Sequence, residues 1–127
     1  MSVTRRRHRT FATVLCLLAL APAAGWAHAY LVKSVPAARA VVSRAPARAQ
    51  LWFNERLEPA YSRVSVVTGQ ESRVDLGDVQ VDPNDPKKLS VGLPPLAPGV
   101  YTVRFRVLSI DAHIVESQFT FTLRGSQ

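Results

Sequence analysis

The stretch Val-Tyr-Thr-Val-Arg-Phe-Arg-Val at residues 100–107 decides the fold class. Apolar side chains alternate along it with Thr102, Arg104 and Arg106. The stretch Gln-Phe-Thr-Phe-Thr-Leu-Arg at residues 118–124 repeats this alternation. Successive residues of a strand point to opposite faces of the sheet. Each stretch is therefore predicted to be a strand with one buried face and one wet face.

Shorter strands are predicted before this pair. We expect them at residues 29–34, 50–54, 61–68 and 89–93, with one or two weak strands within 73–81. Proline, glycine and aspartate punctuate the chain, and residues 82–86 (Asp-Pro-Asn-Asp-Pro) are expected to form a loop. No stretch shows helical periodicity over three turns. About seven strands predict an all-β fold, a small antiparallel sandwich of two sheets.

Residues 1–27 have the features of a cleavable secretory signal peptide. Four arginines lie within residues 5–9, a short apolar run follows at residues 11–20, and Gly25 and Ala27 precede the expected cut. The run is shorter than the roughly 20 residues that cross a bilayer. The general secretory route fits better than twin-arginine export. We therefore expect an exported, periplasmic domain of residues 28–127 that is not embedded in the membrane.

Charge and sulfur content limit the function of this domain. It carries twelve Lys and Arg against nine Asp and Glu, a net charge of +3, with the basic residues scattered singly. Nucleic acid binding normally needs a clustered basic face, so we exclude it. Cys16 is the only cysteine and Met1 the only methionine, and both precede the expected cut. The domain thus lacks the soft sulfur ligands that Cu(I) prefers.

Asp111-Ala112-His113 is the first candidate for metal chemistry. In an extended segment residues two apart point the same way, so Asp111 and His113 would project together. The competing interpretation is a hairpin loop in which the aspartate caps a turn and the histidine is merely exposed. The spacing alone does not decide between them.

His28 is the second candidate, because cleavage after Ala27 would make it the first residue. Its free amine and its ring would then form a chelate. With the His113 ring and an Asp111 oxygen this gives three nitrogens and one oxygen, a set that suits Cu(II), with Ni(II) the nearest rival. A cut after Ala29 would instead discard His28.

Glu55 is a third candidate, at the end of the predicted strand 50–54. It could be a weak axial ligand or an acceptor that orients an imidazole. The equally good alternative is a solvated carboxylate paired with Arg56 or another base.

Four segments in series resemble the CopC family of periplasmic copper-resistance proteins. They are H-A-Y-L-V-K-S-V-P-A from residue 28, L-W-F-N-E-R-L-E-P from 51, L-A-P-G-V-Y-T-V-R-F-R-V-L-S from 96 and I-D-A-H-I-V-E-S-Q-F-T-F from 110. The likeness covers essentially all of residues 28–127 in order.

The resemblance implies a Greek-key sandwich of cupredoxin or immunoglobulin-like kind. It implies one Cu(II) per mature chain, held by an N-terminal histidine brace at His28 and a D-x-H motif at Asp111 and His113. Glu55 matches a glutamate assigned near the Cu(II) site in some members. Residues 67–89 lack methionine, so a Met-rich Cu(I) site should be missing.

The expected protein is a monomer that is not an enzyme. It either sequesters copper or passes it to a CopD-type inner-membrane protein, in copper resistance or homeostasis. Two alternatives belong to other classes. A histidine brace also resembles the copper site of lytic polysaccharide monooxygenases, although those are generally larger and present a broad flat face. The other alternative is a metal-free interaction sandwich with incidental histidines.

Overall fold

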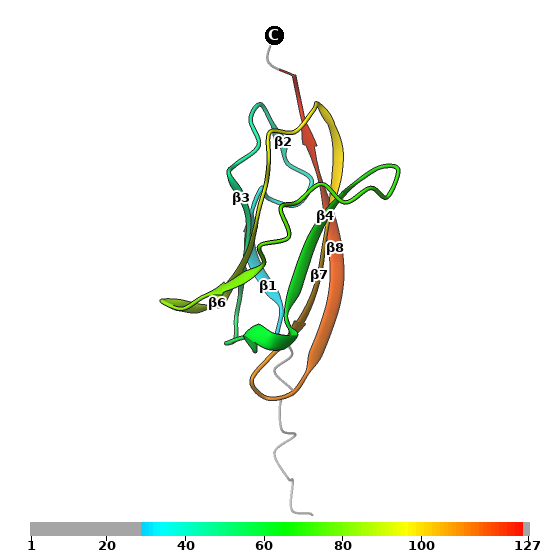
Figure 1. The fold of residues 1–127 in the computed structure, drawn as a ribbon. Coiled ribbons are helices and arrows are strands. Elements are labelled where there is room, and N and C mark those ends of the chain that lie inside the picture. Colours follow the sequence, from blue (N-terminus) through cyan, green and yellow to red (C-terminus); the bar gives the residue numbers. More distant parts are fainter. Residues whose placement is uncertain (1–28, 126–127) are drawn as a thin grey trace, which may run out of the picture.

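The protein is represented by a computed structural model, which describes residues 29–125. The predicted leader and His28 lie outside these residues. The predicted all-β sandwich is confirmed, because the strands form two four-stranded sheets that pack face to face (Figure 1). Within the described range, no helix is long and apolar enough to cross a membrane.

Each sheet draws its strands from distant parts of the chain. The first sheet contains, in spatial order, β1 (Leu31–Val35), β3 (Arg48–Phe53), β6 (Asp85–Gly92) and β5 (Gln80–Asp82). The second contains β2 (Val41–Val42), β8 (Ile114–Leu123), β7 (Gly99–Leu108) and β4 (Arg63–Thr68). A short 3-10 helix, η1 (Pro59–Tyr61), precedes β4. Among the strands of residues 29–125, consecutive strands pair only in the β5–β6 and β7–β8 hairpins, so this part of the chain repeatedly crosses between the sheets.

The core lies between the sheets, where the alternating apolar positions meet. The inward positions of β7 are all buried, as the sequence predicts: Tyr101, Val103, Phe105 and Val107. Phe105 meets Phe53 of the opposite sheet edge to face, with ring centroids 5.3 Å apart. Such an aromatic pair adds stability beyond its buried area, and here it joins the two layers.

Two details of the predicted fold are wrong. The structure contains a two-residue strand, β2, which pairs in parallel with β8, so the second sheet is mixed rather than purely antiparallel. The predicted loop at residues 82–86 shrinks to Pro83 and Asn84, because Asp82 ends β5 and Asp85 begins β6. The Asp82 side chain accepts a hydrogen bond from the Asn84 amide at 2.8 Å, which closes this tight hairpin.

The segment Asp111–His113 forms a turn, so of the two interpretations of its spacing the hairpin loop describes the backbone and the extended segment does not. Residues 110–112 form a turn between β7 and β8, and Ala112 has a positive φ of 68°. Its amide donates to the Ser109 carbonyl at 2.9 Å, a bond that closes the turn. The long β7–β8 ladder on either side brings the two ends of this loop together.

Candidate metal centre

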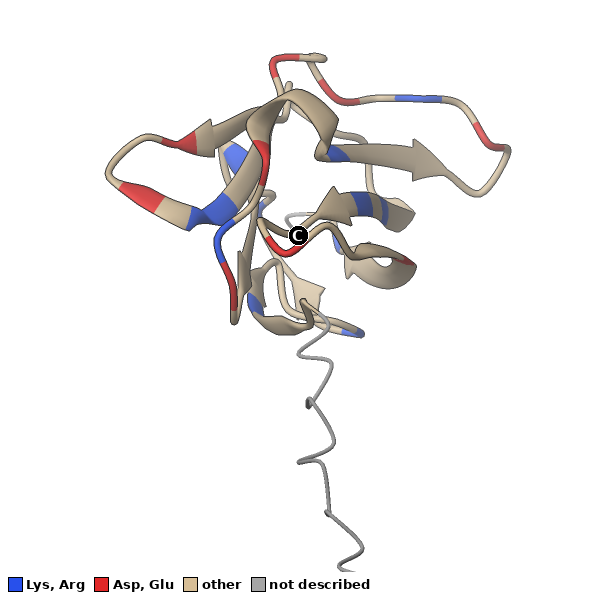
Figure 2. Cartoon of the chain, turned by 90° about the horizontal axis from the view of Figure 1, so that it is seen from below, with Lys and Arg blue, Asp and Glu red and all other residues tan. Residues whose placement is uncertain are grey.

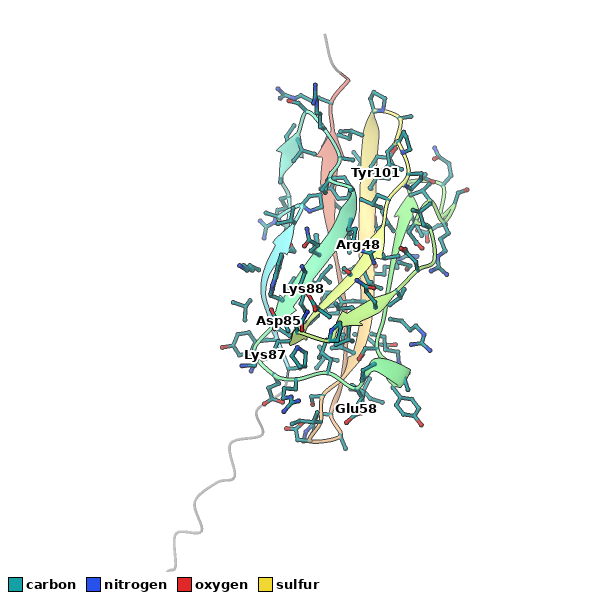
Figure 3. All side chains as sticks on the ribbon, turned by 60° about the vertical axis from the view of Figure 1, so that its left-hand side comes forward. Arg48, Glu58, Asp85, Lys87, Lys88 and Tyr101 are labelled. Carbon is teal, nitrogen blue, oxygen red and sulfur yellow. The ribbon has the colours of Figure 1, made fainter. Side chains whose placement is uncertain are left out.

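Three segments that are distant in sequence meet at one end of the sandwich. They are residues 29–30, the stretch 54–57 after β3, and the β7–β8 loop at 109–113. Figure 1 shows the orange β7–β8 loop and η1 at this lower end, and Figure 3 places Glu58 beside them. We call this region the loop end.

The beginning of the described chain is tied to the stretch after β3. The Tyr30 amide donates to the Asn54 side-chain oxygen at 2.6 Å, and the Asn54 amide donates back to the Tyr30 carbonyl at 3.2 Å. Ala29 is buried in the core at 1% exposure. These contacts fix the position and direction of the chain immediately after His28.

The same stretch is tied to the β7–β8 loop on its other side. The Ile110 amide donates to the Arg56 carbonyl at 3.1 Å, and Leu57 forms an isolated bridge with Ser109. The segment that carries Glu55 thus lies between the start of the domain and the Asp111–His113 loop.

The structure brings Asp111 and His113 together. The Asp111 Oδ1 atom lies 3.2 Å from the His113 Nδ1 atom, and the side chains are 39% and 25% exposed. A turn, rather than an extended strand, produces this contact. An aspartate so placed has two possible roles toward a metal ion. It can be a ligand itself, or it can hold the Nδ1 side of the ring so that Nε2 is left for the metal.

The hydrogen bonds of the loop keep Asp111 in its charged form. The hydroxyl of buried Ser109 donates to Asp111 Oδ1, and His113 also stabilises the carboxylate. Together these interactions outweigh partial burial and hold the pKa of Asp111 below its usual range. The site therefore presents an anionic oxygen at neutral pH, beside an imidazole.

The described residues supply only part of a metal site. Within residues 29–125, no group of three or more His, Cys, Asp or Glu side chains could hold a metal ion. Glu55 is half-buried on the neighbouring stretch but does not complete such a group with Asp111 and His113. A metal ion held by this pair would need a further donor, and His28, which lies outside the described residues, is the candidate that the sequence offers.

Two positioning residues escaped the sequence analysis. Ser109 is fully buried and holds the Asp111 carboxylate, and Asn54 anchors Tyr30 next to the predicted N-terminus. Ser109 stands two residues before the aspartate and Asn54 follows a buried phenylalanine. Both are ordinary strand-end residues in the sequence, and their partners are visible only once the fold brings the three segments together.

The fold and this site define a small two-sheet sandwich with a carboxylate–imidazole pair at one end, beside the start of the domain. Known proteins have the same architecture. A family model described as the CopC domain matches residues 31–124. Protein YobA of Escherichia coli strain K12 is 32% identical over 125 residues, which cover 98% of this chain and 100% of YobA.

Two solved structures extend the likeness. The crystal structure of CopC from Methylosinus trichosporium OB3b is 36% identical, with a TM-score of 0.74, over 79% of this chain and 97% of that one. PcoC from Escherichia coli, a methionine-rich copper resistance protein, is 32% identical, with a TM-score of 0.63, over 77% of this chain and 100% of PcoC.

The chain belongs to the CopC family. Membership places it among copper-binding resistance proteins, which are not enzymes, and sets aside the polysaccharide-oxidising alternative. It also disfavours a metal-free interaction sandwich, because the structural relative PcoC is a copper resistance protein.

Proposed function

We propose that the chain is exported, is cut after Ala27, and then binds one Cu(II) at the loop end. The His28 amine and ring, the His113 ring and the Asp111 carboxylate form the binding set. Copper is the cargo of this protein, which sequesters it in the periplasm or passes it to a CopD-type membrane protein. The observation that carries the proposal is the 3.2 Å contact between Asp111 and His113 beside the start of the domain.

The covalent structure supports a role for His28. His28 immediately precedes Ala29, which is buried at the loop end. Consecutive Cα atoms lie about 3.8 Å apart, so the first residue of the expected mature chain starts next to this end. The Tyr30–Asn54 hydrogen bonds reduce the freedom of the chain at this point. A pre-positioned terminus loses less entropy on binding than a mobile one, which favours chelation.

The donor set supports Cu(II) over Cu(I). Nitrogen and oxygen donors in a tetragonal arrangement suit Cu(II), whereas Cu(I) favours thiolate and thioether sulfur. Residues 28–127 contain neither cysteine nor methionine, in contrast to the methionine-rich relative PcoC. Glu55, on the adjoining stretch, is proposed as an axial ligand or as a group that orients an imidazole.

Replacing His113 tests the proposal. We expect His113→Ala to weaken Cu(II) binding at least tenfold, because the ion loses one of its ring nitrogens. Cu(II) affinity is measured by competition with a chromophoric chelator, at pH 7 and again near pH 5. The affinity should fall at the lower pH, because protons compete for the amine and the imidazoles.

Glu58→Gln is the matched control, since Glu58 also lies at the loop end but outside the proposed donor set. It should leave affinity within about twofold of the unchanged protein. Urea denaturation checks that both variants fold. Equal Cu(II) affinity in the His113→Ala variant and the unchanged protein would exclude the proposed site.

A further inference from the structure

The outer face of the second sheet carries a groove lined with arginine. Its volume is about 490 Å³, and Arg63, Arg73, Arg104 and Arg106 line it together with Glu116 and Gln118. These side chains come from β4, β7, β8 and the loop after β4. We call this feature the arginine groove. Figure 2 shows acidic and basic residues interspersed over the fold, so the groove is a local concentration of arginine rather than one charged side of the protein.

Three of the four arginines already hold carboxylates. Arg104 grips the two oxygens of Glu71, with the Arg104 Nη2 to Glu71 Oε1 distance at 2.8 Å. The Nε atom of Arg106 lies 2.9 Å from Glu116 Oε1, and that of Arg73 lies 2.9 Å from Asp75 Oδ2. The planar guanidinium fork matches a carboxylate with two parallel hydrogen bonds. Arg104 and Glu71 show this paired arrangement, which is the geometry that arginine prefers for a carboxylate.

Two of these internal carboxylates are exposed to solvent. Glu71 and Glu116 are 63% and 67% exposed, and exposed ion pairs contribute little net stability. Asp75 differs, because its side chain is fully buried and also accepts hydrogen bonds from the Val66 and Gly77 amides. Glu71 and Glu116 thus occupy positions that an external carboxylate can take, whereas Asp75 is part of the framework.

Arg63 leaves the groove with unneutralised charge. It lies directly opposite Arg106 in the β4–β7 ladder, and like charges placed in this way are destabilising. Its guanidinium donates to the carbonyls of Ser62 and Pro59, at 2.9 Å and 3.4 Å. Among residues 29–125, Arg63 forms no ion pair. The sheet therefore retains a costly pair of like charges, and within residues 29–125 only Arg106 of that pair is matched by a carboxylate, that of Glu116.

We infer that the arginine groove binds an extended acidic segment of a partner protein. Arg104 and Arg106 are two residues apart on one strand, which separates them by about 6.7 Å. Alternate side chains of an extended peptide have the same spacing, so two acidic residues at positions i and i+2 can meet both arginines. Glu71 and Glu116 leave the guanidinium groups when the segment binds. This surface is separate from the proposed copper site.

A designed peptide tests the inference. The probe is a fluorescein-labelled peptide of four Glu-Ser repeats, and its binding to the purified, copper-free exported protein is followed by fluorescence anisotropy. We expect saturable binding that weakens with salt, and no binding of the matched peptide of four Gln-Ser repeats. The double variant R63Q/R106Q should weaken binding at least tenfold.

Two further variants make the test specific to the groove. The double variant R44Q/R124Q removes the same charge from exposed arginines outside the groove, and it should change the affinity less than R63Q/R106Q does. Glu71→Gln removes an internal competitor, so binding should tighten about two- to threefold. Circular dichroism and Cu(II) titration confirm that each variant keeps its fold and its copper site.

Three outcomes would overturn the inference. The first is an acidic peptide that does not bind. The second is equal weakening by R63Q/R106Q and R44Q/R124Q, which would mean that only net charge matters. The third is binding to phosphatidylglycerol vesicles but not to the peptide, which would assign the groove to a lipid surface.

Discussion

Ser109 connects the fold to the candidate metal site at the level of a single residue. It is fully buried, its amide donates to the His113 carbonyl at 3.0 Å, and its hydroxyl donates to Asp111. One residue thus closes the loop through its backbone amide and fixes the carboxylate through its side chain. In metal sites, groups that orient ligands in this way typically change affinity by about 10–100-fold when removed.

Ser109→Ala should accordingly weaken Cu(II) binding about tenfold, with Asp111 and His113 still present. The alanine leaves the loop backbone unchanged but frees the Asp111 carboxylate. Isothermal titration with Cu(II) measures the effect. Ser117→Ala, an exposed serine of β8, is the control and should bind copper normally. Normal affinity in Ser109→Ala would show that Asp111 needs no such support.

Part of this site could be predicted from the sequence, and part could not. Asp111 and His113 stand two apart in the chain, so a contact between them was predictable, although from an extended segment rather than the observed turn. Ser109 and Asn54 act through partners that the fold supplies. Their roles depend on the β7–β8 register and on the β1–β3 pairing, which no local pattern specifies.

At the scale of elements, the alternation in β7 predicted the buried face because its period matches the pleat of a sheet. The two-residue β2 could not be predicted, since Val41 and Val42 are too short a run to show any period. The start of β6 was missed for a different reason. Asp85 and Pro86 favour turns locally, but pairing of the hairpin draws Asp85 into the ladder with Asp82.

The loop between β4 and β5 is held to the sheet by Asp75. Its buried carboxylate accepts hydrogen bonds from Arg73 and from the Val66 and Gly77 amides. Burial opposes ionisation, but these bonds outweigh it and lower the pKa of Asp75. A carboxyl group with a lowered pKa stabilises the fold above its unfolded pKa of about 3.9. That stability is lost as the pH falls through the folded pKa.

Asp75→Asn should therefore lower the free energy of unfolding by about 1–3 kcal/mol at pH 7, because the amide cannot accept all these bonds. The difference from the unchanged protein should shrink as the pH falls below about 4. Urea denaturation at pH 7, 5 and 3 measures both effects. Asp85→Asn, at the hairpin near Pro83, is expected to cost less than about 0.5 kcal/mol. A difference between Asp75→Asn and the unchanged protein that grows toward pH 3 would contradict the account.

At the scale of the whole molecule, the sandwich carries two surfaces that share no residue. The loop end gathers segments near residues 29, 55 and 111, and copper bound there would join them. The arginine groove lies on the outer face of the second sheet and contains neither Asp111 nor His113. Substitutions in one surface are therefore expected to leave the function proposed for the other unchanged. Membership of the CopC family is consistent with copper binding at the loop end. It does not predict the binding of an acidic segment at the arginine groove.

The central claim is that export creates an N-terminal amine on His28 that completes the copper site. Electron paramagnetic resonance of the purified exported protein with one equivalent of Cu(II) tests it most directly, before and after acetylation of that amine. The account predicts that the exported protein, whose intact mass identifies its first residue, begins at His28. It predicts a copper spectrum with three coordinated nitrogens, one of which is lost on acetylation. A protein that begins at Tyr30, or a copper spectrum that acetylation leaves unchanged, would contradict it.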